Sequence, residues 1–431
     1  MRSGPLHAAL SAAFLALSLT PTDASSAASR INADAWRAPA QSLHPDRQIE
    51  LLERKIGQML VIGFPGTRAD EVWSRRAISM LDRSRIGGVI LFGHNVRNRD
   101  QLSRLTERLN AGGGPPPFVA IDQEGGQIQR LNRRKGFTRL ASAKSIANGS
   151  LCDAYAAYWA TARELARFGI NVSLGPVVDL NINPRNPAIG RLGRSYGTDP
   201  ATVVGFATQF IDAHATAGVL TAAKHFPGHG SAVRDPHHRV VDITTTWQPN
   251  ELEPFSSLAS DDEVAMIMVG HLIHPRFSDG TRPTSLSRRT LTEALRDDLG
   301  FNGLIVTDDL GMDAITERYG PEEAAVMAVR AGADLLIYAN QKPDDGAFVD
   351  DVIAAIAAAA VSGRIPISMI DRAQARILET KRRLSFVPAE GDDTQPMSPA
   401  VAPIGGSFTA ADVAAMTAKA CRPEAEPRGD G

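Results

Sequence analysis

The segment GLIVTDD, residues 303–309, predicts a buried β-strand that carries two carboxyl groups to its carboxyl end. Its apolar residues are continuous rather than alternating. Such a pattern indicates that both faces of the strand are covered, as in parallel sheets flanked by helices. One strand of this kind is compatible with several folds, so the number of similar segments decides between them.

Further segments of the same kind recur along the chain, each near a Gly, Pro or Asp. They are MLVIGF (59–64), GGVILF (87–92), PFVAID (117–122), INVSLGPVVD (170–179), VLTAAKHF (219–226), AMIMVGHL (265–272) and ADLLIYAN (333–340). Amphipathic stretches with helical spacing, such as RDQLSRLTERLN, lie between them. The α/β alternation predicts a (β/α)₈ TIM-type barrel, expected as a single catalytic domain over residues 50–386. The alternative, a doubly wound sheet, would need fewer strands or a second domain.

The two ends of the chain differ in composition from this middle part. Residues 1–28 combine Arg2, an apolar run over about residues 8–19 and then small residues, which is the layout of a secretory signal peptide. The run is too short to cross a bilayer, so we expect export to a periplasm without stable membrane insertion. An Ala-rich helix is the alternative. Residues 387–431 are rich in Pro, Gly, Ala and Ser and predict a mostly irregular C-terminal tail.

Charge and cysteine content exclude some functions. The chain has 46 Lys and Arg against 48 Asp and Glu, so it has no positive excess to attract nucleic acid. Cys152 and Cys421 are too few for a cysteine-based zinc site; in an oxidising compartment they either pair or remain two thiols. We expect a monomer without a cofactor.

The segment KHFPGHGSAVRDPHH, residues 224–238, contains four histidines. His225 and His229 are four residues apart, but Pro227, Gly228 and Gly230 argue against the helix that would place them on one face as metal ligands. We therefore expect no metal. A zinc-dependent hydrolase that uses His225, His229 and His237 stays open as an alternative.

The same segment offers a group for proton transfer. Asp235 lies two residues before His237, and a carboxylate at that position would raise the pKa of the imidazole above its usual value of about 6.5. An imidazole of this kind suits a general acid and base near neutral pH. A solvated polar turn is the alternative. His229 and His238 are assigned no catalytic role.

The segment at 303–309 offers a nucleophile. Asp308 follows the predicted strand directly, and a carboxyl with a usual pKa of about 3.9 is ionised at pH 7 and attacks an electrophilic carbon without a separate base. Asp309 would point elsewhere and cap the following turn.

Two other segments carry residues suited to binding hydroxyl groups. AIDQEGGQIQRL, residues 120–131, places Asp122 at a strand end and Arg130 eight residues later. A carboxylate accepts hydrogen bonds from sugar hydroxyls, and a guanidinium donates them. Arg194 lies in NPAIGRLGRSYGTDP. Taken alone, the Asp122 segment is equally compatible with a tight turn, and Arg194 with an ordinary surface arginine.

Together, AIDQEGGQIQRL, GRSYGTDP, KHFPGHGSAVRDPHH and IVTDDLGM resemble, in order and spacing, the bacterial β-N-acetylglucosaminidases of glycoside hydrolase family 3. The resemblance implies a retaining exo-glycosidase that releases terminal N-acetyl-β-hexosamine through a covalent glycosyl-enzyme. It implies that Asp308 is the nucleophile and that His237 is the acid/base with Asp235 as its partner. Its sugar-binding positions fall on Asp122, Arg130, Arg194, Lys224 and His225.

Three positions depart from the family pattern. Pro236 stands where Ser is typical, Gln127 replaces an Arg, and Gly311 replaces a Ser. Pro236 restricts both its own backbone and that of Asp235, which affects the geometry of the Asp235–His237 pair. The alternatives are a non-catalytic sugar-binding protein and a phosphorylase. The resemblance also leaves two substrates open, peptidoglycan fragments and chitooligosaccharides.

Overall fold

The computed structural model describes residues 44–384, except 113, 236–239, 261–263 and 340–346. Within this part of the chain, eight strands form one parallel sheet in the order β11-β9-β7-β6-β3-β2-β1-β12. In chain order they are β1 (Leu60–Ile62), β2 (Gly88–Leu91), β3 (Phe118–Ile121), β6 (Val172–Ser173), β7 (Leu220–Phe226), β9 (Met266–Val269), β11 (Leu304–Thr307) and β12 (Leu336–Tyr338). Each strand falls within one predicted apolar segment.

The sheet closes on itself between β11 and β12. Val306 and Leu335 form a parallel bridge, and the Thr307 amide donates to the Leu335 carbonyl at 3.0 Å. An open doubly wound sheet would leave these two strands as free edges. The prediction of a TIM-type barrel is therefore confirmed.

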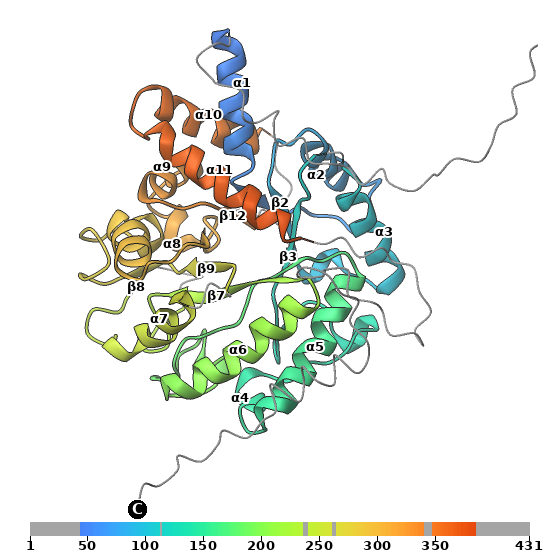
Figure 1. Cartoon of the computed structure of the whole chain (residues 1–431), viewed down its shortest axis with the longest axis vertical. Coiled ribbons are helices and arrows are strands. Elements are labelled where there is room, and N and C mark those ends of the chain that lie inside the picture. Colours follow the sequence, from blue (N-terminus) through green and yellow to red (C-terminus); the bar gives the residue numbers. More distant parts are fainter. Residues whose placement is uncertain (1–43, 113, 236–239, 261–263, 340–346, 385–431) are drawn as a thin grey trace, which may run out of the picture. The chain divides into compact units, whose positions relative to one another are not determined.

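Helices cover the outside of the strands, as the labelled elements in Figure 1 show. The longer ones are α1 (Pro45–Gly57), α2 (Val72–Asp82), α3 (Arg99–Asn110), α5 (Leu151–Arg167), α6 (Pro200–Thr216), α7 (Glu253–Ser260), the π-helix η8 (Arg289–Asp298), α9 (Pro321–Ala331), α10 (Phe348–Val361) and α11 (Ile367–Arg382). The short ones are α4 (Ala143–Ile146), α8 (Asp313–Thr316) and the 3₁₀ turns η3 (Gly93–Asn95), η4 (Arg133–Lys135), η5 (Gly190–Leu192), η6 (Pro249–Leu252) and η7 (Thr284–Leu286).

Strand β6 is shorter than its apolar segment predicts. It ends at Ser173, and pairing with β7 resumes at an isolated bridge between Val177 and Lys224. Pro176 lies between these points and has no amide hydrogen to donate to the ladder. The chain therefore leaves regular strand geometry before it reaches Asp179.

Two small sheets are added beside the barrel. Strands β4 (Gln123–Gly125) and β5 (Ile128–Gln129) form an antiparallel hairpin directly after β3. Strands β8 (Val241–Asp242) and β10 (Leu272–Ile273) pair in parallel, so the chain that follows the histidine-rich segment lies beside the chain that follows β9. Both sheets shape the side of the barrel where the strands end.

The described residues belong to one compact unit with a continuous apolar core. Strands β1, β2, β3, β9, β11 and β12 are buried along their whole length, which explains their unbroken apolar sequences. Among the described helices, none combines the length and apolarity needed to cross a bilayer. The predicted signal peptide at 1–28 and the tail at 387–431 lie outside the described residues, as does Cys421, so its pairing with Cys152 stays a prediction.

Candidate active site

A cavity of about 380 Å³ opens where the barrel strands end. Its lining includes the sequence-predicted residues Asp122, Arg130, Arg194, Lys224, His225 and Asp308. They come from segments up to 186 residues apart in the chain, from Asp122 to Asp308, and the barrel brings them to one face because its parallel strands all end there. Asp235 is described but is not among the lining residues, and Pro236 and His237 lie outside the described residues.

Asp122 is held between two cations. The Lys224 ammonium donates to one of its carboxylate oxygens at 2.8 Å, and Arg130 donates to the other at 3.1 Å. Burial alone would raise the pKa of Asp122, but Lys224 and Arg130 lower it by more, so the pKa lies well below its usual value. The carboxylate is thus ionised and positioned to accept hydrogen bonds from hydroxyl groups.

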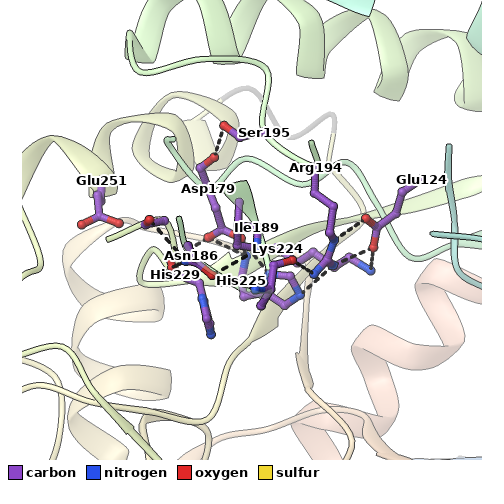
Figure 2. A network of polar contacts seen from close by, with 12 residues as sticks. Glu124, Asp179, Asn186, Ile189, Arg194, Ser195, Lys224, His225, His229 and Glu251 are labelled. Atoms are coloured by element: carbon purple, nitrogen blue, oxygen red, sulfur yellow. Dashed lines mark hydrogen bonds and ion pairs between the residues drawn. The ribbon is translucent and has the colours of Figure 1, made fainter. Parts of the chain in front are cut away.

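Glu124, which the sequence analysis passed over, forms a second ion pair in the same wall. Arg194 donates to its two oxygens at 2.7 and 2.8 Å, and the Lys224 ammonium lies 2.7 Å from one of them (Figure 2). Burial would raise the pKa of Glu124, but Arg194 and Lys224 bring it below its usual value. Its position two residues after Asp122 could have identified it as a cavity residue, since residues i and i+2 of an extended segment face the same side.

Asp179 orients His225, near the end of β7, and His229, in the segment that follows. It is fully buried and accepts from the His225 ring nitrogen Nδ1 at 2.7 Å and from the His229 backbone amide at 2.7 Å. Because a carboxylate only accepts, His225 carries a proton on Nδ1. Its Nε2 lies 3.5 Å from the Arg194 guanidinium, which only donates. The Nε2 edge of His225 therefore lies beside Arg194 at the cavity.

Asp308 lies directly after β11 and is half-buried. One of its oxygens accepts from the Asp309 amide at 2.9 Å. Burial would raise the pKa of Asp308, but the nearby His271 and His225 and this hydrogen bond bring it below its usual value. The group is therefore a carboxylate at neutral pH, as a nucleophile requires.

Asp309 has the different environment that the sequence predicted. Its carboxylate accepts from the Gly311 amide at 2.8 Å, which caps the following turn, and from the Ala339 amide at 2.9 Å. Burial raises its pKa. Gly311, one of the departures from the family pattern, approaches this carboxylate closely, since an added Cβ would lie 3.0 Å from Asp309 Oδ1.

His271 supports the nucleophile from β9. Its Nε2 donates to the Asp309 carbonyl at 2.9 Å, and its Nδ1 lies 2.7 Å from the Ser285 hydroxyl. Both ring nitrogens are thus occupied by the protein, and the ring is fully buried. His271 contacts the backbone next to Asp308 and positions it.

The described residues contain no cluster of three His, Cys, Asp or Glu side chains arranged to hold a metal ion. The zinc alternative required His237 as a third ligand, and this residue lies outside the described part. His225 and His229 do lie close together, with ring centroids 6.0 Å apart. Gln127, another departure from the family pattern, is exposed.

The chain matches the family model "Glycosyl hydrolase family 3 N terminal domain" over residues 51–380. A curated Beta-hexosaminidase of Tolumonas auensis is 36% identical over 271 residues, covering 62% of this chain and 79% of that protein. Beta-hexosaminidase A of Pseudoalteromonas piscicida is 33% identical and covers 71% of this chain, but this chain spans only 54% of that protein.

A solved structure has the same fold. The glycoside hydrolase family 3 β-N-acetylglucosaminidase from a Paenibacillus strain matches with a TM-score of 0.71 and 31% identity. The match covers 86% of this chain and 68% of that one. The region matched by the family model contains all eight strands of the barrel and every described residue of the cavity.

Proposed function

The chain belongs to glycosyl hydrolase family 3 as a β-N-acetylhexosaminidase, and we propose that it is a retaining exo-glycosidase acting through a covalent glycosyl-enzyme. The observation that carries this proposal is the state of Asp308. It is a carboxylate at the end of β11, in a cavity whose other wall presents ionised Asp122 and Glu124 with their cations. A free carboxylate facing a hydroxyl-binding wall is the arrangement that a double displacement needs.

In the proposed first step, an Asp308 oxygen attacks the anomeric carbon, and the bond to the leaving oxygen breaks. The electron pair stays on that oxygen, which takes a proton from His237. In the second step, water attacks the anomeric carbon, His237 removes a proton from the water, and the Asp308 carboxylate is released. Asp235 would orient His237 and stabilise its protonated form.

The binding wall has a separate role in this proposal. Asp122, paired with Lys224 and Arg130, accepts from sugar hydroxyls, while His225, oriented by Asp179, contacts another polar group of the sugar. The ion pairs also keep these side chains in place before substrate arrives, which lowers the entropic cost of binding. Because the charged wall and Asp308 line one cavity of about 380 Å³, we propose removal of one terminal residue at a time.

Trapping tests the nucleophile directly. A 5-fluorinated N-acetylglucosaminyl fluoride slows both steps, and mass spectrometry should find one glycosyl group on the peptide that contains Asp308. Asp308→Asn should remain unlabelled and lose at least about 10³-fold in kcat on an aryl N-acetylglucosaminide. Labelling of another residue, or an α-configured first product by NMR, would refute the proposal.

The natural substrate is proposed to be N-acetylglucosamine-terminated peptidoglycan fragments or chitooligosaccharides in a periplasm, where the N-terminal segment would deliver the enzyme. Assays on chitobiose and on a muropeptide, each with and without phosphate, separate the substrates and distinguish hydrolysis from phosphorolysis. Binding of N-acetylglucosamine without turnover of any of these substrates would indicate a non-catalytic sugar-binding protein instead. Activity lost after chelation and restored by zinc would favour the metal-dependent alternative.

A further inference from the structure

His229 is a buried imidazole at the cavity whose polar atoms have no protein partner in the described part of the chain. Its side chain lines the cavity together with Arg194, His225 and Asp308, and the residue is only 2% exposed. Neither Nδ1 nor Nε2 makes a hydrogen bond to any described residue. A buried donor or acceptor left unpaired costs about 1–3 kcal/mol, so such a ring points to a ligand.

The backbone around His229 is fixed on both sides. Its amide donates to Asp179 at 2.7 Å, and its carbonyl accepts from the Asn186 side chain at 2.7 Å. Gly230 approaches the chain so closely that an added Cβ would lie 1.6 Å from the Leu180 carbonyl oxygen. Figure 2 shows the His229 ring extending away from Asn186 and Asp179, beside His225. The backbone that carries the ring is therefore fixed in place.

The imidazole is neutral at physiological pH. Burial lowers the pKa of His229 to about 4; Asp179 opposes this shift, whereas His225 and Arg194 add to it. A neutral imidazole offers one N–H donor and one acceptor. It therefore suits a neutral ligand group that carries both an acceptor and a donor.

An apolar wall lies beside the ring. The Asn186 oxygen accepts from the amides of Ala188 and Ile189 at 2.8 and 3.1 Å, while its nitrogen holds the His229 carbonyl. Ala188 and Ile189 both line the cavity. Asn186 thus joins a neutral polar ring and an apolar surface into one unit. Arg194 links this unit to the charged wall, since it donates to the Ala188 carbonyl at 2.9 Å and to Glu124.

We propose that His229, with the wall of Ala188 and Ile189, forms the subsite that recognises the acetamido group of the sugar. This group presents a C=O, an N–H and a methyl, which match the donor, the acceptor and the apolar wall. The charged wall serves the hydroxyl groups. The inference rests on the proposed function and assigns to His229 the selection of N-acetylhexosaminides over hexosides that lack the acetamido group.

Substrate discrimination tests the inference. We expect His229→Phe, which keeps the ring volume and removes both polar atoms, to lower kcat/KM on 4-nitrophenyl N-acetyl-β-glucosaminide by about 10- to 100-fold. Activity on 4-nitrophenyl β-glucoside should change less than 3-fold, so the selectivity ratio falls by about the same 10- to 100-fold factor. His229→Gln retains a donor and an acceptor and should recover at least half of the lost selectivity on a logarithmic scale.

His214 provides a matched control. It is also fully buried, its Nε2 has no described partner, and burial lowers its pKa to about 4, but it lies on α6 and does not line the cavity. His214→Phe should leave the selectivity ratio within 2-fold of the wild-type value, whatever it does to the melting temperature. Competition by free N-acetylglucosamine and by glucose gives a second readout that needs no turnover of the glucoside.

The outcomes separate the two proposals. Equal losses on both substrates, or an unchanged ratio in His229→Phe, would overturn the acetamido subsite and leave the retaining mechanism standing. A wild-type enzyme that cleaves neither substrate, yet binds N-acetylglucosamine more weakly after His229→Phe, would overturn the hydrolase and keep the subsite. If the wild type cleaves neither substrate and His229→Phe binds N-acetylglucosamine as tightly as the wild type does, both the hydrolase and the subsite would be overturned.

Discussion

Glu124 connects two of the cations that surround the cavity. Its carboxylate is nearly buried and binds Arg194 through both oxygens as well as Lys224. Removing one member of a buried ion pair leaves the others uncompensated, which costs about 3–5 kcal/mol when the charge is lost completely. Single side chains in this site are therefore interdependent.

Glu124→Gln should consequently disturb the two cations that this carboxylate holds in the cavity wall. We expect kcat/KM on the aryl N-acetylglucosaminide to fall about 10²-fold, because Arg194 and Lys224 lose the charge that holds them. The free energy of unfolding, measured in urea, should fall by about 2 kcal/mol. Glu293→Gln is the control: its ion pair with Arg288 at 3.7 Å is half-exposed and should contribute almost nothing. Equal effects of the two substitutions would contradict this view of the site.

The turn after β7 is the element that places His229, four residues after His225 of β7. Gly228 has a φ of +114°, and Gly230 leaves no room for a side chain beside the Leu180 carbonyl. Gly230→Ala should therefore push the turn away from Asp179 and reduce kcat/KM by more than about 10²-fold. Gly218→Ala, at a φ of +73° with open space around it, should cost stability only. Full activity in Gly230→Ala would show that the turn tolerates displacement.

Helix α11 is attached to the opposite end of the barrel through a buried lysine. Lys381 donates to the Gln58 side chain at 2.9 Å and to the Gly87 carbonyl at 2.8 Å, just before β1 and β2. Burial lowers its pKa to about 7. Between about pH 7 and the unfolded value of about 10.4, the unfolded chain binds more protons at this site than the folded protein, so stability should rise with pH.

Lys381→Met removes this titration. The urea-unfolding free energy of the wild type should increase by roughly 3 kcal/mol from pH 7 to pH 9.5 relative to the variant. Kinetic constants at pH 7 should be similar in the two proteins, because the lysine lies far from the carboxyl ends of the strands. If the free energy of unfolding varies with pH in the same way in the wild type and in Lys381→Met, then Lys381 keeps an ordinary pKa.

At the scale of the whole molecule, Asp334 secures the closure between β11 and β12. It is fully buried, accepts from the Ile305 amide at 2.8 Å, and pairs with Arg376 at 2.8 Å and with Arg296. It thus ties η8, α11 and the barrel seam together at the end away from the cavity.

Asp334→Asn should lower the stability of the protein and leave its catalytic constants nearly unchanged. Loss of the buried charge leaves two arginines without their anion, and we expect the melting temperature to fall by roughly 5–10 °C. KM and kcat at 25 °C should change less than 2-fold, because no cavity residue contacts Asp334. A large change in KM would show that the seam transmits strain to the catalytic face. Calorimetry and steady-state kinetics on the same preparations make the comparison.

The sequence alone determined the barrel and the identity of its main polar residues. Continuous apolar segments predicted all eight strands, since burial on both faces leaves little room for polar residues. The spacing of Asp122, Lys224, His225 and Asp308 along these strands indicated one face, because parallel strands end together. The helical spacing of residues 99–110 likewise matched α3.

Only the tertiary structure decided how these residues pair. Glu124 binds Arg194 across 70 residues, and Asp179 orients His225 and His229 from the segment after β6. No local pattern encodes such contacts, since they depend on barrel closure and on which side chain reaches across the cavity. His229 shows this most clearly. In the sequence it is one more histidine in a glycine-rich turn, whereas in the fold its imidazole lines the cavity with no hydrogen-bond partner among the described residues.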